Sequence, residues 1–287
     1  MHALAMPSSL AWRTLGAPRR AGGALHVAPR VPGYRVLREL GTGGRSSAWL
    51  AGEEASGGTF VLKLQPADGA TLHREWEVAA GLADRHVVRI HDHGRDGRWA
   101  WLVLEYLAGG DLAHRLRAPV GLPQARLWIA QAARGLAALH RHGYVHRDVK
   151  PANFLLRADG DLVLADLGLA VRPGPVAAGL AQGTVPGTPR YLAPAQLQGA
   201  PAAPAADVYS LGVLLHEMLC GRPPFAGETL MEVLSQHLVA APPRLPAALA
   251  DLQPLVDRML AKEVQHRLPD AEAVLDLLSQ GGSRDPE

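Results

Sequence analysis

The hydrophobic pattern changes its period about a third of the way along the chain. Up to residue 106, short runs of β-branched, aromatic and leucine residues alternate with Gly and Asp, which predicts strands. One helix, over residues 71–82 with Thr71 as its N-cap, interrupts these runs. The expected strands cover residues 34–40, 47–51, 59–64, 87–91 and 99–105.

From residue 112 onward the apolar residues recur at helical spacing. Residues 123–142 carry one apolar face and end before Gly143, a typical helix stop. Residues 207–219 are nearly apolar all round, which predicts a buried helix. Two more helices are expected over residues 252–260 and 270–279. A strand-rich half followed by a helical half predicts an α+β fold with two lobes and a cleft between them.

The composition is that of an ordinary globular protein. The chain has 287 residues, is 48% hydrophobic and 20% charged, and carries a net charge of +2, so no nucleic-acid or membrane partner is indicated. Cys220 is the one cysteine, which excludes a disulfide scaffold. The apolar runs are shorter than the ~18 residues that a spanning helix needs. Without membrane or export signals, we expect a cytoplasmic protein.

The two ends of the chain differ in composition from the residues between them. Residues 1–33 contain four arginines and no acid, which we interpret as a loosely ordered basic arm. A transit peptide has a similar composition, and a misassigned start upstream of the domain would look the same. Residues 280–287 are expected to form a frayed tail.

A glycine-rich segment, residues 40–46, lies between two expected strands. Glycines there let the backbone approach a polyphosphate, whose charge backbone N–H groups can meet. A glycine-rich hairpin turn would read the same. The segment is not a P-loop, because no Lys-Ser or Lys-Thr follows at that spacing and the next element is a strand.

Charged and amide side chains gather later in the chain, in residues 146–153, His-Arg-Asp-Val-Lys-Pro-Ala-Asn. An Asp with a nearby Lys can orient a hydroxyl and accept its proton. Asn153 offers an oxygen to a hard cation, and Asp166 offers another at the end of an apolar strand beside Gly168. Such a sparse ligand set suits Mg²⁺ when phosphates supply the remaining oxygens.

In chain order these motifs resemble the eukaryotic-type (Hanks-type) protein kinases, and most closely their bacterial serine/threonine branch. The resemblance covers residues 34–278 and includes Gly-Thr-Pro-Arg-Tyr-Leu-Ala-Pro at 187–194. It implies a serine/threonine protein kinase that uses ATP on a protein substrate the sequence does not name. The implied lobes are residues 34–106 and 107–279, with the nucleotide cleft between them.

The resemblance also implies roles for individual residues. Asp148 would take the acceptor proton and Lys150 would hold the transferring phosphate. Lys63, paired with Glu75, would meet the α- and β-phosphates. The interval between these two is short for the family, and Glu77 is the rival, about 200° round the helix from Glu75.

Further implied roles concern the metal and the nucleotide. Asn153 and Asp166 would bind Mg²⁺, with Mn²⁺ as the alternative ion. The nucleotide-binding positions are Leu40, Gly41, Thr42, Gly43, Gly44, Ala48, Val61, Lys63, Leu104, Glu105, Leu107, Asp111 and Leu155, with Leu104 as gatekeeper, Leu155 as floor and Asp111 near the ribose.

Two departures from the family pattern concern the nucleotide pocket. Ser46 replaces the third glycine of the loop, and Leu167 replaces the Phe of Asp-Phe-Gly. The family's Val after the loop is Ala48, and its Ala before the strand Lys is Val61. We interpret this pair as a swap that conserves the volume of the adenine pocket.

A third departure from the family pattern removes an acidic side chain. Ala195 replaces the acid of Ala-Pro-Glu, whose partner in relatives corresponds to Arg267. Arg267 is then solvated, or pairs with another acid such as Glu263 or Asp270, or weakens the helical lobe. This is the main argument for the alternative function, a nucleotide-binding pseudokinase scaffold. A small-molecule phosphotransferase is a third reading, which the peptide-cradling segment 187–194 disfavours.

Regulation is indicated by the segment before residue 193. Arg147, beside Asp148, could dock a phosphate, as in kinases whose activation segment is ordered by phosphorylation. Thr188 falls where the family uses Thr to contact the catalytic loop, which leaves Thr184 as the candidate for autophosphorylation or as a plain loop threonine. Autophosphorylation in trans would involve a transient homodimer.

Overall fold

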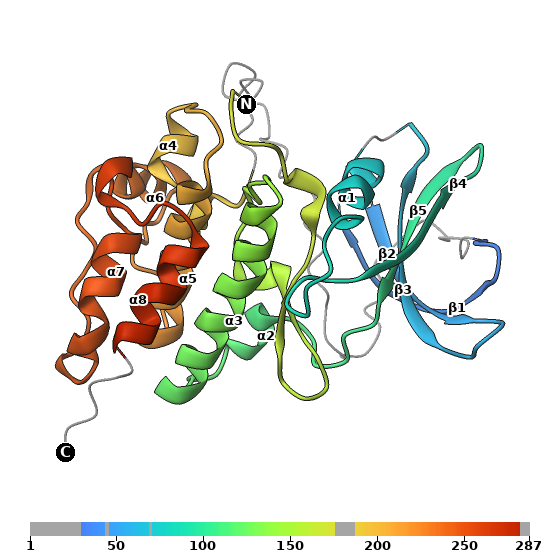
Figure 1. The fold of residues 1–287 in the computed structure, drawn as a ribbon, viewed down its shortest axis with the longest axis horizontal. Helices are drawn as coiled ribbons and strands as arrows, with labels where there is room; N and C mark the ends of the chain where they lie inside the picture. Colours follow the sequence, from blue (N-terminus) through green and yellow to red (C-terminus); the bar gives the residue numbers. More distant parts are fainter. Residues whose placement is uncertain (1–29, 44–45, 69–70, 176–186, 282–287) are drawn as a thin grey trace.

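The computed structural model describes residues 30–43, 46–68, 71–175 and 187–281. Its first part is a single antiparallel sheet of five strands in the order β1-β2-β3-β5-β4. One helix, α1 (Thr71–Ala79), lies against β4 and β5 (Figure 1). The strands are β1 (Tyr34–Gly43), β2 (Ser46–Glu53), β3 (Thr59–Pro66), β4 (Ile90–Arg95) and β5 (Trp99–Glu105).

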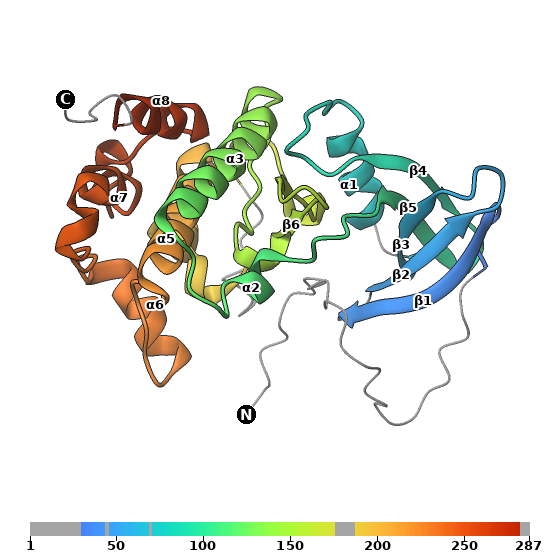
Figure 2. The same ribbon diagram turned by 90° about the horizontal axis from the view of Figure 1, so that it is seen from below.

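The second part is mainly helical and lies beside the sheet along the long axis of the molecule (Figure 1). A small two-stranded sheet, β6 (Phe154–Leu156) with β7 (Leu162–Leu164), lies between the helices and the large sheet (Figures 1 and 2). The predicted two-lobed α+β fold is therefore confirmed. The helices are α2 (Leu112–Arg115), α3 (Leu122–Arg141), α4 (Pro194–Leu197), α5 (Pro204–Cys220), α6 (Leu230–Val239), α7 (Gln253–Met259) and α8 (Ala271–Gly281).

The largest hydrophobic core surrounds α3 and α5, which lie side by side in Figures 1 and 2. As expected, α5 is buried along most of its length. The expected stop of α3 is also present, because Gly143 adopts a φ of 76°, which favours glycine. Each fully buried leucine or valine stabilises this core by roughly 1.5–3 kcal/mol relative to exposure. The helical part therefore gives rigid support to the loops that it carries.

The fourth strand does not lie where the hydrophobic pattern predicts it. It runs over Ile90–Arg95 rather than residues 87–91. The Val88 N–H instead donates to the Leu164 carbonyl at 2.8 Å, and Val87 forms an isolated bridge with Leu164. These β-branched residues therefore join the sheet-bearing lobe to β7, and the strand begins after them.

The pattern also missed α6, although its start carries a recognisable signal. The Thr229 hydroxyl accepts a hydrogen bond from the Glu232 N–H at 3.2 Å. A Thr followed three residues later by Glu is the sequence signature of such a start. The helix follows closely on the prolines Pro223 and Pro224, which mask its start in the hydrophobic pattern.

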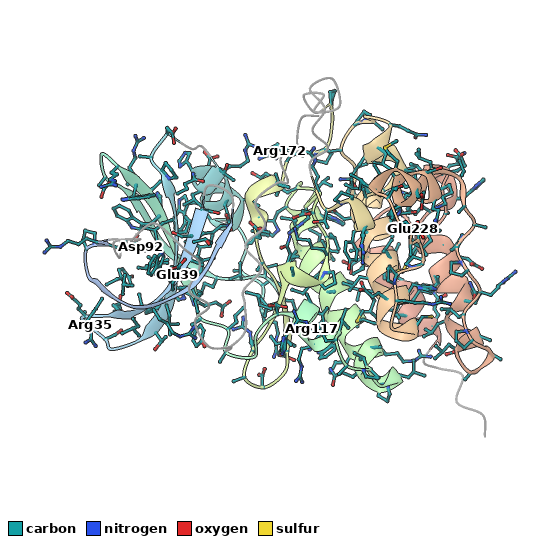
Figure 3. The ribbon with its side chains drawn as sticks, turned by 180° about the vertical axis from the view of Figure 1, so that it is seen from behind. Arg35, Glu39, Asp92, Arg117, Arg172 and Glu228 are labelled. Carbon is teal, nitrogen blue, oxygen red and sulfur yellow. The ribbon has the colours of Figure 1, made fainter. Side chains whose placement is uncertain are left out.

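The chain ends and several surface residues are the remaining features of the fold. The basic arm and the frayed tail lie almost entirely outside the described residues. In Figure 3, Arg35, Glu39 and Asp92 mark the sheet, and Glu228 marks the helical part at the other end. Within the described ranges, no helix combines the length and the apolar character needed to cross a membrane.

Candidate functional site

Lys63, on the central strand β3, lies at the centre of a buried group of charges. Its ammonium lies 2.7 Å from Glu75 Oε2 on α1 and 2.7 Å from Asp166 Oδ1, which follows β7. Glu75 is fully buried, whereas the Glu77 side chain is 60% exposed and lies 3.3 Å from His73. The geometry therefore pairs Lys63 with Glu75.

Burial and the neighbouring charges have opposite effects on the pKa of Lys63 and on that of Asp166. Burial alone would lower the pKa of Lys63, but the carboxylates of Asp166 and Glu75 hold it above its usual value. Burial opposes ionisation of Asp166, yet the Lys63 charge keeps its pKa below the ordinary range. Lys63 and Asp166 are therefore both charged at neutral pH, and their ion pair joins β3 to the end of β7.

The segment 146–153 places Asp148 among three polar side chains. Lys150 Nζ lies 2.5 Å from Asp148 Oδ2 and 2.9 Å from the Thr188 hydroxyl. That hydroxyl donates to Asp148 Oδ1 at 3.1 Å, so Thr188 makes the contact expected of it. Asn153 Nδ2 donates to the carbonyl and to Oδ2 of Asp148, at 2.8 and 3.0 Å. Both carboxylate oxygens are thus held in fixed directions.

Two residues beside these carboxylates adopt a backbone conformation that L-residues rarely take. Arg147 has a φ of 69° and Asp166 a φ of 60°. Such conformations cost about 1–3 kcal/mol each and persist only where the surroundings impose them. Asp207, fully buried on α5, imposes the first by accepting the N–H groups of His146 and Arg147 at 2.7 and 2.8 Å.

No role was predicted for Asp207, which opens the apolar run of residues 207–219. It also accepts a hydrogen bond from His140 Nε2 on α3, at 2.9 Å. A buried carboxylate must find donors or lose its charge. A lone Asp in an otherwise apolar helix was therefore the signal that could have identified this anchor.

Asn153 and Asp166 provide the oxygens that a hard cation would need. The Asn153 carbonyl accepts the N–H of Ala165 at 2.8 Å, which brings the residue next to Asp166. Asn153 Oδ1 is buried and has no hydrogen-bond partner in the described part of the chain. An amide oxygen without a partner beside an ionised carboxylate fits Mg²⁺ or a similar ion. No cluster of three His, Cys, Asp or Glu side chains able to bind a metal occurs in the described ranges.

The predicted adenine-pocket residues come together in one hydrophobic cluster. Ala48 and Val61 lie on the same face of the β2–β3 pair and are 1% and 2% exposed. The cluster holds side chains from β2, β3, β5 and β6, so it joins the sheet to the small hairpin. Its members include Leu40, Ala48, Val61, Leu104, Leu107 and Leu155.

The described residues of the glycine-rich segment lie at the end of β1 and the start of β2. Gly41 pairs with Ala48, Thr42 with Ser47 and Gly43 with Ser46. Gly44 lies outside the described residues. These pairs place Gly41, Thr42 and Gly43 beside the strand that carries Ala48.

Glu105 and Asp111 lie at the connection between the lobes. The Glu105 carboxylate accepts the Arg89 N–H at 2.8 Å and pairs with Arg157, so its side chain is engaged outside the hydrophobic cluster. Asp111 caps α2 by accepting the His114 N–H at 2.7 Å, and burial raises its pKa. Both residues fix the backbone that links the sheet to the helices.

Arg267 follows neither of the first two expectations for it, solvation or pairing with another acid. Its side chain is buried and donates to the carbonyls of Ala205, Ala261 and Lys262 at 2.9–3.0 Å. Its guanidinium also lies over the Tyr209 ring, 5.0 Å from the centroid. The charge is thus neither solvated nor paired with Glu263 or Asp270, and backbone carbonyls satisfy it in place of the missing acid.

Of the two residues with a predicted regulatory role, the structure describes only Arg147. Thr184 lies outside the described residues. Arg147 is half-buried, and burial lowers its pKa; Asp207 acts against this, and the neighbouring Arg74 acts with it. Burial is thus the main influence on the Arg147 charge.

Comparison with known proteins agrees with this geometry. The profile of the protein kinase domain matches residues 34–277. The serine/threonine-protein kinase PknL of Mycobacterium tuberculosis is 37% identical over 237 residues, covering 79% of this chain and 59% of that protein. The serine/threonine-protein kinase drp72 of Corynebacterium efficiens is 35% identical over 273 residues, covering 89% of this chain and 52% of that protein. The chain thus spans little more than half the length of these curated relatives.

Proposed function

The chain belongs to the protein kinase family, among its bacterial serine/threonine kinases, and from this premise we propose that it transfers the γ-phosphate of ATP to serine and threonine hydroxyls of proteins. The observation that carries the proposal is the arrangement of Asp148, Lys150 and Thr188, in which each side chain lies within 3.1 Å of the other two. This arrangement can hold a hydroxyl and a phosphate together.

In the proposed reaction the acceptor oxygen attacks the γ-phosphorus, and the bond to the bridging β–γ oxygen breaks. Asp148 takes the hydroxyl proton, and ADP leaves. Lys150 meets the negative charge on the transferring phosphate. Phosphoryl transfer needs alignment and countercharge more than covalent help from protein. A lysine held 2.5 Å from the proton acceptor supplies both at one point.

Lys63 is proposed to hold the α- and β-phosphates, with Glu75 fixing its direction. The adenine would lie in the hydrophobic cluster between Ala48, Val61 and Leu155, and the backbone of residues 105–107 would bond its edge. The proposal is supported by the burial of these apolar side chains and by the fixed position of the Lys63 ammonium. The lobes on either side are residues 34–106 and 107–279.

The family uses a divalent ion with ATP, and we propose Mg²⁺, with Mn²⁺ as an alternative. Asn153 and Asp166 would hold the ion, which neutralises phosphate charge when bound. The unpartnered Oδ1 of Asn153 supports this assignment.

We also propose a regulatory role for Arg147. Phosphorylation of Thr184 by a second copy of the chain, in a transient homodimer, would create an anion that Arg147 and Arg74 can bind. The half-buried position of Arg147, directly before Asp148 in the chain, supports the idea.

The test is transfer of labelled γ-phosphate from ATP to the chain and to a generic basic protein, with Mg²⁺ or Mn²⁺. Label on serine and threonine, and none on tyrosine, is expected. Metal-dependent nucleotide binding without transfer would overturn the proposal in favour of a pseudokinase scaffold.

A further inference from the structure

His237 is a fully buried histidine on α6 that contacts the segment next to the catalytic residues. Its Nε2 lies 3.0 Å from the carbonyl of Arg190. A carbonyl only accepts, so Nε2 must carry the proton. Nδ1 then accepts from the Tyr209 hydroxyl at 3.0 Å, a shorter contact than that hydroxyl makes with the His237 carbonyl at 3.4 Å.

Lys262 fixes the direction of this chain of hydrogen bonds. Its ammonium donates to the Tyr209 hydroxyl at 3.1 Å and to the carbonyls of His237 and Gln236 at 2.8 and 3.2 Å. It also lies 4.0 Å from the centroid of the Phe225 ring. Because the Tyr209 oxygen accepts from Lys262, its own proton is directed to His237, and the imidazole is held in one tautomer.

The ring stays neutral, as these contacts require. Burial lowers the pKa of His237 to about 4, and the nearby Lys262 charge acts in the same direction. At physiological pH His237 is therefore a fixed donor to Arg190 rather than a titrating group.

Arg190 lies in the short 3-10 turn η4 (Pro189–Tyr191), directly after Thr188. Thr188 contacts both Asp148 and Lys150. A shift of the Arg190 carbonyl would therefore also move the backbone next to Thr188. The Thr188 side chain orients Asp148, the proposed proton acceptor. Contacts of η4 with α5 and α6 hold it in place, and the His237 bond is the side-chain contact from α6.

The acid that the family pattern places directly after this segment is absent. Ala195 has no ionisable group, and Arg267 donates to three backbone carbonyls in the core. The segment 187–194 is anchored by hydrogen bonds from several elements. His237 donates to the Arg190 carbonyl and Ser210 to the Tyr191 carbonyl at 2.6 Å, while the Tyr191 hydroxyl donates to Glu217 Oε2 on α5 at 2.6 Å.

We propose that His237 is a positioning residue for protein phosphorylation, which fixes the Arg190 carbonyl and so shapes the surface on which the protein substrate lies. Lys262 and Tyr209 act through it by fixing its tautomer. The kinetic consequence rests on the proposed function, whereas the anchoring of the segment does not.

Two substitutions of His237 by amide residues distinguish the loss of its hydrogen bond to Arg190 from the replacement of a buried histidine by another polar side chain. His237→Gln keeps an N–H donor at the distance of Nε2, while His237→Asn is one methylene too short to reach Arg190. His216→Asn is the matched control, because His216 is also buried and its Nδ1 lies 3.1 Å from the Arg222 carbonyl, away from this segment.

The first measurement is amide hydrogen exchange over residues 187–192, which needs no activity. Exchange in His237→Asn is expected to be about tenfold faster than in the wild type, as the loss of one buried hydrogen bond implies. Wild-type exchange is expected in His237→Gln and His216→Asn. Equal exchange in all four proteins, or equal acceleration in both Asn variants, would overturn the proposal.

The second measurement is steady-state kinetics. The KM for a protein substrate is expected to rise about tenfold in His237→Asn, with the KM for ATP unchanged and with recovery in His237→Gln. A parallel rise in both KM values would indicate general loosening and contradict the proposal. If the wild type transfers no phosphate, the proposed function fails, and hydrogen exchange still decides the anchoring role of His237.

Discussion

The ammonium of Lys63 lies 2.7 Å from Oε2 of Glu75, a contact that joins the central strand β3 to the helix α1. Spacing along the chain left Glu75 and Glu77 as rivals for this contact. The structure separates them by burial, since the Glu75 side chain is 0% exposed and the Glu77 side chain 60% exposed. The position of α1 is thus coupled to the direction of the lysine that is proposed to meet ATP.

Removing the Glu75 charge should therefore impair phosphate transfer. In Glu75→Gln, kcat/KM for ATP is expected to fall by about 10²-fold, because a misplaced Lys63 no longer aligns the phosphates. Glu77→Gln lies on the same helix and should retain wild-type kinetics. Steady-state assays of both variants decide the pairing, and equal losses would contradict it.

Ala48 and Val61 should act as a coupled pair. Val61→Ala opens a gap at the proposed adenine site, and Ala48→Val overfills the same space, which typically costs about 1–3 kcal/mol. Each single variant should weaken nucleotide binding by about tenfold, while the double variant returns to within about threefold of the wild type. A titration of ADP binding completes this cycle. Additive effects would show that the two positions do not share the pocket.

The sequence predicted the catalytic loop better than it predicted what holds the loop in place. Asp148, Lys150 and Asn153 lie within eight residues, so local spacing was enough to bring them together. The strand at residues 87–91 was misplaced because Val87 and Val88 pair with Leu164, a partner from the other lobe that no local pattern reveals.

The roles of Asp207 and His237 were not predicted, because both residues contact groups that are distant in the sequence. Asp207 and His237 support the site from helices 60 and 47 residues away from the groups they contact. Lone buried polar residues in helices are visible in a sequence, but their partners are not. The fate of Arg267 was likewise open, since backbone carbonyls leave no sequence signal.

Arg267 should stabilise the helical lobe through its three carbonyl contacts. A lysine cannot reach three acceptors in one plane, so Arg267→Lys is expected to lower the free energy of unfolding by about 2–3 kcal/mol. Arg258→Lys, at an exposed position of α7, should change it by less than about 0.5 kcal/mol. Urea denaturation measures both. Equal stability of the two variants would mean that the Arg267 contacts contribute nothing.

His237 should make the fold sensitive to acid. Its pKa is about 4 in the folded chain against an ordinary value of 6.5, so the unfolded chain binds more protons between these pH values. The stability contribution is complete above pH 6.5 and declines as the pH falls toward 4, by about 3 kcal/mol in total.

The comparison protein for this effect is His237→Gln, which has no titrating group at the position. Between pH 6.5 and 4, its free energy of unfolding should fall by about 3 kcal/mol less than that of the wild type. Identical pH profiles from chemical denaturation would show that His237 is not held neutral by its surroundings.

The most direct test of the whole account is single-turnover phosphate transfer by Asp148→Asn, measured beside its affinity for ATP. Asn keeps the size of the side chain but cannot take the acceptor proton, so the transfer rate should fall by about 10²- to 10⁴-fold with unchanged ATP binding. Asp159→Asn, at an exposed turn, serves as the control and should transfer phosphate at the wild-type rate. Transfer by Asp148→Asn at the wild-type rate would contradict the proposed kinase mechanism.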